Sequence, residues 1–268
     1  MPQADLVVTD LDGTLWFGDE QIHPATVAAW RELERRDVPV LVATGRRVTS
    51  TRVPLARLGF APPAVVMNGA LVLHLETGER YHRHVYSADD ARRVLAAFRA
   101  AHIEPCVYVD HDRVDVFVSE QPSTHPAHLE SLGTTAEHAD LDDVVGSMPV
   151  LMFGIMGNDA GHLTEVASAL FGVAETHLAP SDQYGGHSFT VTPIGLSKWV
   201  GVVAYCEQHG IDPNRVLAIG DGPNDCELLG GAAVAVVPSD ACADALDLAD
   251  HVVASPRDGG WAEILDLV

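Results

Sequence analysis

Two carboxylates stand two residues apart near the start of the chain, directly after a short apolar run. The run covers residues 6–9, and the acids are Asp10 and Asp12 in the stretch Asp10-Leu11-Asp12-Gly13-Thr14-Leu15. If the run is a buried strand, both acids lie at its carboxyl end, where open α/β sheets bind their ligands. Acids this close repel each other unless a cation lies between them or one of them keeps a proton. The spacing therefore indicates a bound cation, catalysis, or both.

Three further motifs carry polar groups at the ends of predicted strands or at a helix start. They are Thr44-Gly45-Arg46, Lys198 within Gly195-Leu196-Ser197-Lys198, and Gly220-Asp221-Gly222-Pro223-Asn224-Asp225. Loops that follow parallel strands meet at one edge of the sheet, so we expect these motifs to converge on one crevice. Together with the two acids they supply a candidate nucleophile, a hydroxyl, an ammonium and further carboxylates. This set suits metal-assisted phosphoryl transfer.

The elements that must position these motifs alternate between buried strands and helices at both ends of the chain. We expect strands at 6–9, 38–43 and 64–67 with a helix at 24–36, and then a helix at 198–209, strands at 216–219 and 233–237 and a helix at 240–248. Pro24 suits a first helical turn, and Gly210 suits a helix end. This alternation is typical of a parallel sheet with helices on its faces.

The middle of the chain has a different pattern. Strands are predicted in pairs, at 71–75 with 81–85 and at 106–109 with 114–118, with helices at 88–101 and 162–170. Hairpins mixed with helices indicate a separate α+β module. We therefore expect a parallel-sheet domain formed by 1–81 and 188–268, and an α+β domain inserted at 82–187.

Composition excludes several classes of partner. The chain carries 16 Lys and Arg against 38 Asp and Glu, a formal net charge of −22, which repels nucleic acid and anionic membrane surfaces. Its 4 cysteines form no C-x-x-C pair, which argues against a zinc knuckle or a disulfide framework. Without a recognisable targeting segment or a long apolar run, we expect a cytoplasmic protein. The oligomeric state leaves no sign in the sequence.

The four motifs, in this order, resemble those of the haloacid dehalogenase superfamily of phosphohydrolases. The stretches Leu41-Val42-Ala43-Thr44-Gly45-Arg46 and Met67-Asn68-Gly69-Ala70 make the resemblance closest to Cof-type phosphatases. It covers 1–81 and 188–268, and it implies a Rossmann-like three-layer α/β core. Only 34 positions separate Asp10 from Thr44, whereas 154 separate Thr44 from Lys198, which leaves room for the large C2-type cap of such proteins.

One departure from the Cof-type pattern concerns the rim of the site. Where these proteins usually show Gly-Asn-Ala after the strand that follows the fourth motif, this chain has Val237-Pro238-Ser239. The difference bears on the geometry of the rim more than on the chemistry.

The resemblance implies a role for each matching residue. Asp10 would attack phosphorus and form an aspartyl-phosphate, while Asp12 would protonate the leaving oxygen and then activate water. Mg²⁺ would bind the Asp10 carboxylate, the Asp12 carbonyl and Asp221. Asp225 would orient Lys198 or a metal-bound water. The expected phosphate-binding residues are Leu11, Thr44, Gly45, Lys198 and Asn224, and the candidates for substrate or cap contacts are Arg46, Asn68, His187 and Ser188.

The sequence thus favours a Mg²⁺-dependent phosphatase acting on a small phosphomonoester, such as a sugar phosphate. A phosphomutase of the same superfamily is the enzymatic alternative, and it would isomerise substrate without releasing an excess of phosphate. A non-catalytic ligand-binding or regulatory module is the alternative from another class, and the intact set of acids and the lysine speaks against it. A dehalogenase is disfavoured because Asp12 supplies the acid that phosphoester chemistry needs.

The role implied for Asp12 predicts a dependence on the leaving group. Asp12→Asn should slow the hydrolysis of alkyl phosphates, which are poor leaving groups, more than that of p-nitrophenyl phosphate, because a good leaving group departs without a proton. Steady-state turnover of the two substrate types measures this difference. Equal losses for both would rule out the acid role.

Overall fold

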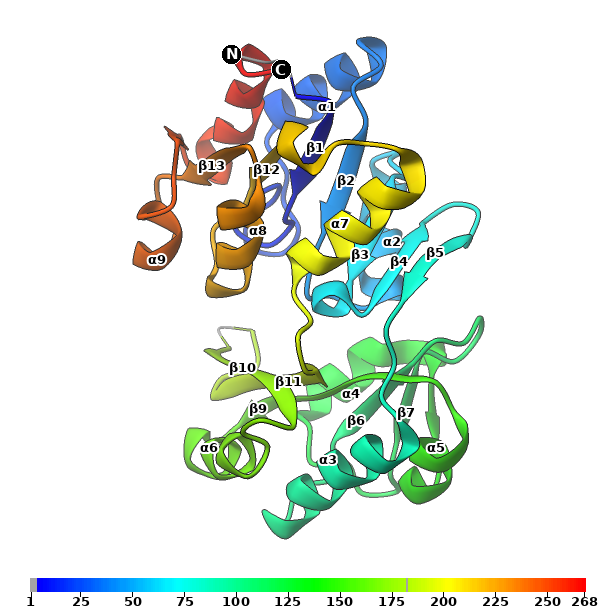
Figure 1. Cartoon of the computed structure of the whole chain (residues 1–268). Helices are drawn as coiled ribbons and strands as arrows, with labels where there is room; N and C mark the ends of the chain where they lie inside the picture. Colours follow the sequence, from blue (N-terminus) through cyan, green and yellow to red (C-terminus); the bar gives the residue numbers. More distant parts are fainter. Residues whose placement is uncertain (1–3, 182) are drawn as a thin grey trace. The chain divides into compact units, whose positions relative to one another are not determined.

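The computed structural model describes residues 4–181 and 183–268, and the chain divides into two compact units (Figure 1). The first unit comprises Met1–Arg83 and Ser197–Val268, and the second comprises His84–Leu196. The second boundary therefore lies at 196/197 and not at the expected 187/188. The physical reason is strand β11 (His187–Pro193), which pairs with β9 and β10 inside the second unit. The first boundary moves from 81/82 to 83/84.

The first unit is built on an eight-stranded sheet with the order β14-β13-β12-β1-β2-β3-β4-β5. Its strands are β1 (Leu6–Thr9), β2 (Val40–Ala43), β3 (Pro63–Val66), β4 (Leu71–His74), β5 (Arg80–Arg83), β12 (Val216–Ile219), β13 (Val234–Pro238) and β14 (His251–Val253). The run from β14 to β3 is parallel, and β4 and β5 add an antiparallel edge. β1 lies between β2 and β12, so the loops after these three strands meet at one edge.

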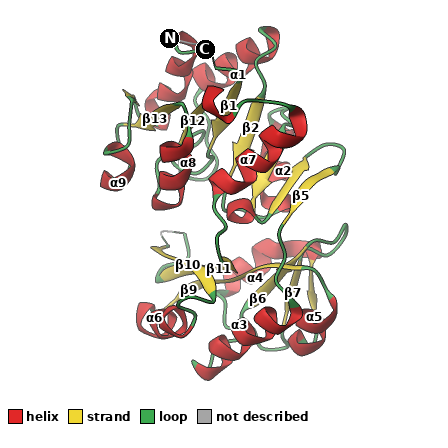
Figure 2. Cartoon of the chain, in the orientation of Figure 1, coloured by secondary structure: helices red, strands yellow, loops and turns green. Residues whose placement is uncertain are grey.

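Helices cover both faces of this sheet (Figures 1 and 2). On one face, Leu6 and Val8 of β1 share a buried cluster with Val202 of α7 (Lys198–His209), and α8 (Cys226–Gly231) and α9 (Ala243–Leu246) contribute to the same cluster. On the other face, α1 (Pro24–Arg35) packs on the 3-10 helix η6 (Gly260–Asp266), and Trp30 stacks on Trp261 at 5.8 Å. The result is the three-layer α/β core that the sequence predicts.

Two helices of the first unit contrast in how clearly the sequence marks them. α7 starts at Lys198 because the Ser197 hydroxyl accepts a hydrogen bond from Val200 N, and it ends where Gly210 turns left-handed at φ 68°. α2 (Val48–Arg57) has no side-chain cap and contains Pro54. Proline and β-branched residues are poor helix formers, so α2 is absent from the sequence prediction.

The second unit has its own six-stranded sheet, with the order β10-β11-β9-β6-β7-β8. Its elements are α3 (Ala88–Ala100), β6 (Cys106–Val109), β7 (Val116–Val118), α4 (Pro126–Leu132), β8 (Ala136–His138), α5 (Leu141–Ser147), β9 (Val150–Asn158), α6 (Ala160–Ala169), β10 (Ala174–Pro180) and β11. Phe98 packs against both Phe153 and Phe189 in a core to which the helices α3, α5 and α6 also contribute. This separate core makes the unit an α+β domain. In the described residues, no helix has the length and apolar character needed to cross a membrane.

Trp261 ties the C-terminal 3-10 helix to the centre of the first sheet, which predicts a large cost for its removal. Its ring stacks on Trp30, and its Nε1 donates to Thr9 Oγ1 at 2.9 Å. Trp261→Ala should lower the free energy of unfolding by about 3–5 kcal/mol, because it leaves a large cavity. Tryptophan fluorescence during urea unfolding reports on the first unit alone, since all 4 tryptophans of the chain lie there. Val252→Ala is the control, because Val252 is 56% exposed and its loss should cost no more than about 0.5 kcal/mol.

Candidate active site

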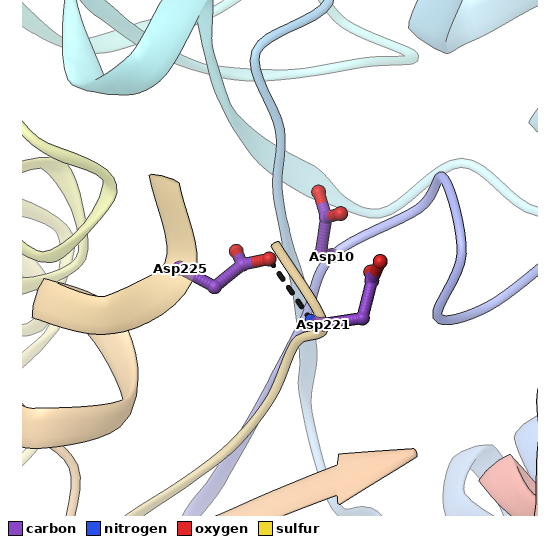
Figure 3. A group of neighbouring side chains, drawn as sticks. All are labelled: Asp10, Asp221 and Asp225. Atoms are coloured by element: carbon purple, nitrogen blue, oxygen red, sulfur yellow. Dashed lines mark hydrogen bonds between the residues drawn. The ribbon is translucent and has the colours of Figure 1, made fainter. Parts of the chain in front are cut away.

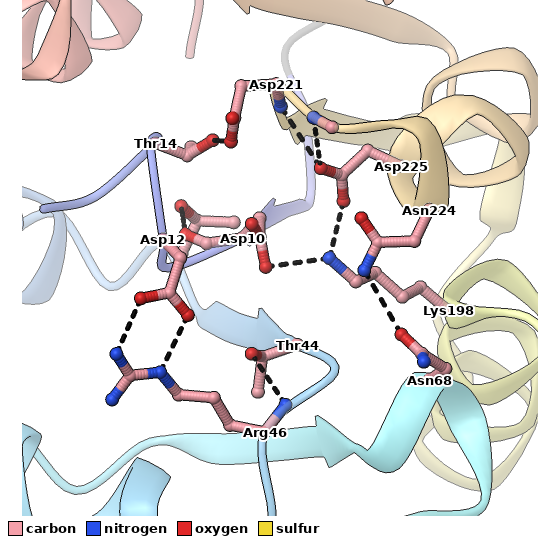
Figure 4. Close-up of polar contacts among 12 residues, drawn as sticks. Asp10, Asp12, Thr14, Thr44, Arg46, Asn68, Lys198, Asp221, Asn224 and Asp225 are labelled. Atoms are coloured by element: carbon pink, nitrogen blue, oxygen red, sulfur yellow. Dashed lines mark hydrogen bonds and ion pairs between the residues drawn. The ribbon is translucent and has the colours of Figure 1, made fainter. Parts of the chain in front are cut away.

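Four loops of the first unit bring the motif residues together at the carboxyl edge of its sheet (Figure 4). Asp10 follows β1, Thr44 follows β2 and Asp221 lies two residues after β12, while Lys198 is the first residue of α7. The structure therefore joins side chains that lie up to 211 positions apart in the sequence.

Lys198 is held between two buried carboxylates. Its Nζ donates to Asp10 Oδ1 and to Asp225 Oδ1, each at 2.7 Å. The Lys198 and Asp225 side chains are fully buried, and that of Asp10 is 8% exposed. A charge this deep is stable only when it is paired. Asp225 also fastens the fourth loop, because its Oδ2 accepts hydrogen bonds from the N–H groups of Asp221 and Gly222.

Asp221 is fixed on the other side of Asp10. Its Oδ1 accepts a 2.6 Å hydrogen bond from the Thr14 hydroxyl. Gly13 makes this close approach possible: a Cβ at Gly13 would lie 2.3 Å from Asp221 Oδ2, and its φ is +80°, a left-handed value that disfavours other residues.

Asp10, Asp221 and Asp225 form a cluster that fits a cation (Figure 3). One carboxylate oxygen from each lies within 4.8 Å of the others, and the Lys198 ammonium contacts two of the three. Burial raises the pKa of Asp10 well above its usual range, and the Asp225 carboxylate adds to this rise while Lys198 opposes it. Burial also raises the pKa of Asp221 to about 6, against the hydrogen bond from Thr14. The donors are oxygens alone, which suits a hard divalent cation.

Asp12 points away from this cluster and is half exposed. Arg46 holds it with one edge of the guanidinium: Nη2 donates to Asp12 Oδ1 and Nε to Oδ2, each at 2.6 Å. The indole N–H of Trp16 donates to Oδ1 at 2.9 Å. The two acids at the start of the chain therefore occupy different environments, one buried against an ammonium and one at the surface of the site in a guanidinium pair.

The loops that follow β1 and β2 offer hydrogen-bond donors around Asp10. The Thr44 hydroxyl accepts a bond from Arg46 N at 3.1 Å, which leaves its own hydrogen able to reach an oxyanion. Among the described residues, no acceptor takes the backbone N–H of Leu11 or of Gly45. Unpaired N–H groups in a turn are suited to binding an anion.

Asn68 and Asn224 link the loops that follow β2, β3 and β12. Asn224 Nδ2 donates to Asn68 Oδ1 at 3.2 Å, and Asn68 N donates to Thr44 O at 3.1 Å. Asn68 is buried with a φ of 54°, and a Cβ on the neighbouring Gly69 would lie 2.2 Å from Ser197 O. The 3-10 helix η1 (Met67–Gly69) therefore packs tightly between the second loop and the start of α7.

The remaining predicted residues make contacts within their own units. Arg46 is directed to Asp12 and to Glu20. His187 and Ser188 lie on β11 of the second unit, where Ser188 Oγ donates to Ala179 O at 3.3 Å. Sequence reasoning missed Trp16 and Glu20. In the sequence, the one sign of such a contact is that Trp16 lies four residues after Asp12.

The loop that departs from the Cof-type pattern still supports the fourth motif. Ser239 N donates to Val253 O at 2.9 Å, which keeps the end of β13 on β14. Three residues later, Cys242 N donates to Asp221 O at 3.0 Å. The rim is thus tied directly to the loop that carries Asp221.

Comparison with known proteins identifies the family. The sequence model of the family of haloacid dehalogenase-like hydrolases matches residues 7–265. The chain therefore belongs to this family. The chain is similar to a phosphoglycolate phosphatase of Methanopyrus kandleri, with 26% identity over 98% of this chain and 96% of that protein. It is similar to an HMP-PP phosphatase of Enterobacter sp. (strain 638), with 28% identity over 85% of this chain and 81% of that protein.

Solved structures support the fold. A haloacid dehalogenase-like hydrolase from Bacteroides thetaiotaomicron superposes with a TM-score of 0.81 and covers 99% of both chains at 23% identity. The likeness at this identity concerns the fold, and it extends over both units of the chain.

The Lys198 pairing predicts a large loss of stability when the ammonium is removed. Lys198→Met leaves two buried carboxylates without a counterion, so the free energy of unfolding in EDTA should fall by about 3–5 kcal/mol. Adding Asp225→Asn should recover part of this loss. Urea unfolding followed by tryptophan fluorescence measures both changes.

The matched control is Arg35→Met, because Arg35 pairs with Glu32 while 72% exposed. This variant should change the free energy of unfolding by no more than about 1 kcal/mol. A Lys198→Met protein as stable as the wild type would show that the buried ion pair contributes nothing.

Proposed function

We propose that the protein is a Mg²⁺-dependent phosphatase that hydrolyses a small phosphomonoester through an aspartyl-phosphate on Asp10. The observation that carries this proposal is the unequal placement of the two acids. Asp10 is buried against Lys198 beside Asp221, whereas Asp12, two residues on, is half exposed. One site thus offers a fixed nucleophile and a separate proton carrier.

In the proposed reaction, a carboxylate oxygen of Asp10 forms a bond to phosphorus while the bond from phosphorus to the leaving oxygen breaks. Asp12 gives its proton to that oxygen. Asp12 then takes a proton from a water molecule as the water oxygen attacks phosphorus, which releases inorganic phosphate and restores Asp10. Lys198 keeps Asp10 in place, because its Nζ contacts Asp10 Oδ1 in the buried pair.

The cation site would be formed by the Asp10 carboxylate, the Asp12 carbonyl and Asp221. Bound Mg²⁺ would supply positive charge against the phosphoryl oxygens. Asp225 fits a positioning role better than direct ligation, since Oδ1 contacts Lys198 and Oδ2 accepts two backbone N–H groups. The raised pKa values of Asp10 and Asp221 are consistent with a site that needs a cation.

Donors around Asp10 would hold the transferred phosphoryl group. The Thr44 hydroxyl, the N–H groups of Leu11 and Gly45 and the Lys198 ammonium supply both hydrogen bonds and positive charge. Such preorganised donors stabilise charge that spreads over the phosphoryl oxygens during transfer. Asn224 lies beside them in its bond to Asn68.

The relatives and the second unit support the proposed substrate class. The two relatives are named for phosphoglycolate and for HMP-PP, which supports a small phosphorylated metabolite. We infer that the second unit is a C2-type cap and that it selects the leaving group, with His187 and Ser188 of β11 as candidate contacts. The donors around Asp10 would recognise the phosphoryl end of the substrate.

Phosphate release tests the proposal. The purified protein should release phosphate from p-nitrophenyl phosphate and from members of a panel of small phosphomonoesters in Mg²⁺, and should lose this activity in EDTA. Asp10→Asn should reduce turnover by about 10³-fold or more, because the nucleophile is lost. Asp37→Asn, a change on the exposed left-handed residue Asp37 (φ 55°), should keep wild-type turnover. Failure to release phosphate from any substrate, or full activity in Asp10→Asn, would refute the mechanism.

A further inference from the structure

We propose that Glu20 is a positioning residue for Asp12 and acts through Arg46. This inference rests on the proposed phosphatase function. It assigns a task to a residue outside the four motifs, in the turn that follows the first of them.

Glu20 lies in a tight hairpin between Asp12 and α1. Phe17 and Gln21 exchange backbone hydrogen bonds of 2.9 and 3.0 Å, and Glu20 N donates to Gly18 O at 3.0 Å. Glu20 has a φ of 58°, a left-handed conformation that costs free energy for a residue with a side chain. The hairpin is held from outside as well, because the Arg257 guanidinium lies over the Phe17 ring at 4.6 Å. The hairpin therefore fixes the backbone from which the Glu20 side chain reaches Arg46.

The Glu20 side chain holds the one edge of Arg46 that Asp12 does not use. Glu20 Oε1 lies 2.5 Å from Arg46 Nη1, and Ser50 O accepts from the same nitrogen at 3.1 Å. The Trp16 ring, which is fully buried, lies 4.9 Å from the guanidinium carbon. Arg46 is therefore fixed by a carboxylate, a carbonyl and an aromatic face, and its Nε and Nη2 are aimed at Asp12.

This arrangement determines which oxygen of Asp12 can exchange a proton. Asp12 Oδ1 accepts from Trp16 Nε1 and from Arg46 Nη2, whereas among the described residues the one donor to Oδ2 is Arg46 Nε. A carboxylate offers about two acceptor positions per oxygen. Both positions of Oδ1 are taken and one on Oδ2 is open, so Oδ2 is the oxygen that keeps a position for a proton.

Without Glu20, Arg46 loses its strongest partner on the outer edge. Among the described residues, Nη1 would then keep the Ser50 carbonyl as its acceptor. The Arg46 guanidinium could rotate while still bonded to Asp12. Since the Glu20 and Arg46 side chains are 30% and 23% exposed, water screens this pair less than a fully exposed one. General acid catalysis depends on placement within hydrogen-bond reach of the leaving oxygen, so a small rotation of Asp12 would lower its efficiency.

The test compares two leaving groups in one enzyme preparation. Glu20→Ala should lower turnover of an alkyl phosphate by about 10-fold and that of p-nitrophenyl phosphate by less than about 3-fold, because only the first needs a well-placed acid. Glu20→Gln keeps an acceptor for Nη1 and should restore most of the alkyl phosphate activity. The ratio of the two turnover numbers is independent of the folded fraction, so partial unfolding cannot imitate the result.

Two further variants sharpen the test. Glu32→Ala is the matched control. Like Glu20, Glu32 pairs with arginine, and its side chain is 28% exposed, close to the 30% of Glu20. The ratio of the two turnover numbers in this variant should equal that of the wild type. In an Asp12→Asn background, Glu20→Ala should have no further effect on the ratio, because the residue through which it acts is already lost.

The outcomes separate this inference from the proposed function. If the wild type hydrolyses both substrates and Glu20→Ala leaves their ratio unchanged, the positioning role is wrong and the phosphatase function stands. An additive effect of Glu20→Ala in the Asp12→Asn background would also overturn the positioning role. If the wild type hydrolyses neither substrate, the proposed function itself fails.

Discussion

The site depends on one constraint: an ammonium buried between two carboxylates. Lys198 contacts Asp10 and Asp225 at 2.7 Å with no exposed side-chain surface of its own. Because a buried charge must be paired, this contact obliges the end of β1, the start of α7 and the loop after β12 to meet at one point. Every other group of the site is then placed relative to it. Glycine at position 13 and the left-handed Asn68 allow the neighbouring loops to close around this pair.

Around this fixed centre the acids differ in exposure, since the Asp10 side chain is 8% exposed and that of Asp12 is 51% exposed. Asp221 is held by one hydroxyl, and Asp12 by a guanidinium and an indole at the surface. A rigid buried group is suited to attack, whereas a partly exposed group is suited to exchange protons with a leaving group and water. In the proposed mechanism, this difference in burial would separate the two tasks.

The sequence predicts those parts of the fold in which local pattern and tertiary role agree. The apolar run before Asp10 forms β1 with its expected bounds, and α7 runs from Lys198 to His209 as its serine cap and final glycine indicate. α2 is not predicted, because Pro54 and the β-branched residues at its start are poor helix formers and the helix is stabilised by packing. The pairs of Asp12 with Arg46 and of Arg46 with Glu20 span 34 and 26 positions, and no periodicity links residues at those separations.

The order of the strands has a consequence for how the chain is made. β1 pairs with β2 on one side and with β12 on the other, and β12 follows the whole second unit in the sequence. During synthesis, the first 83 residues therefore cannot complete their sheet, and Asp10 has no ammonium beside it until Lys198 emerges. Long-range pairing of this kind slows folding and leaves strand edges exposed. The second unit builds its sheet from strands of one continuous segment, His84–Leu196, so its strand pairing does not wait for residues made later.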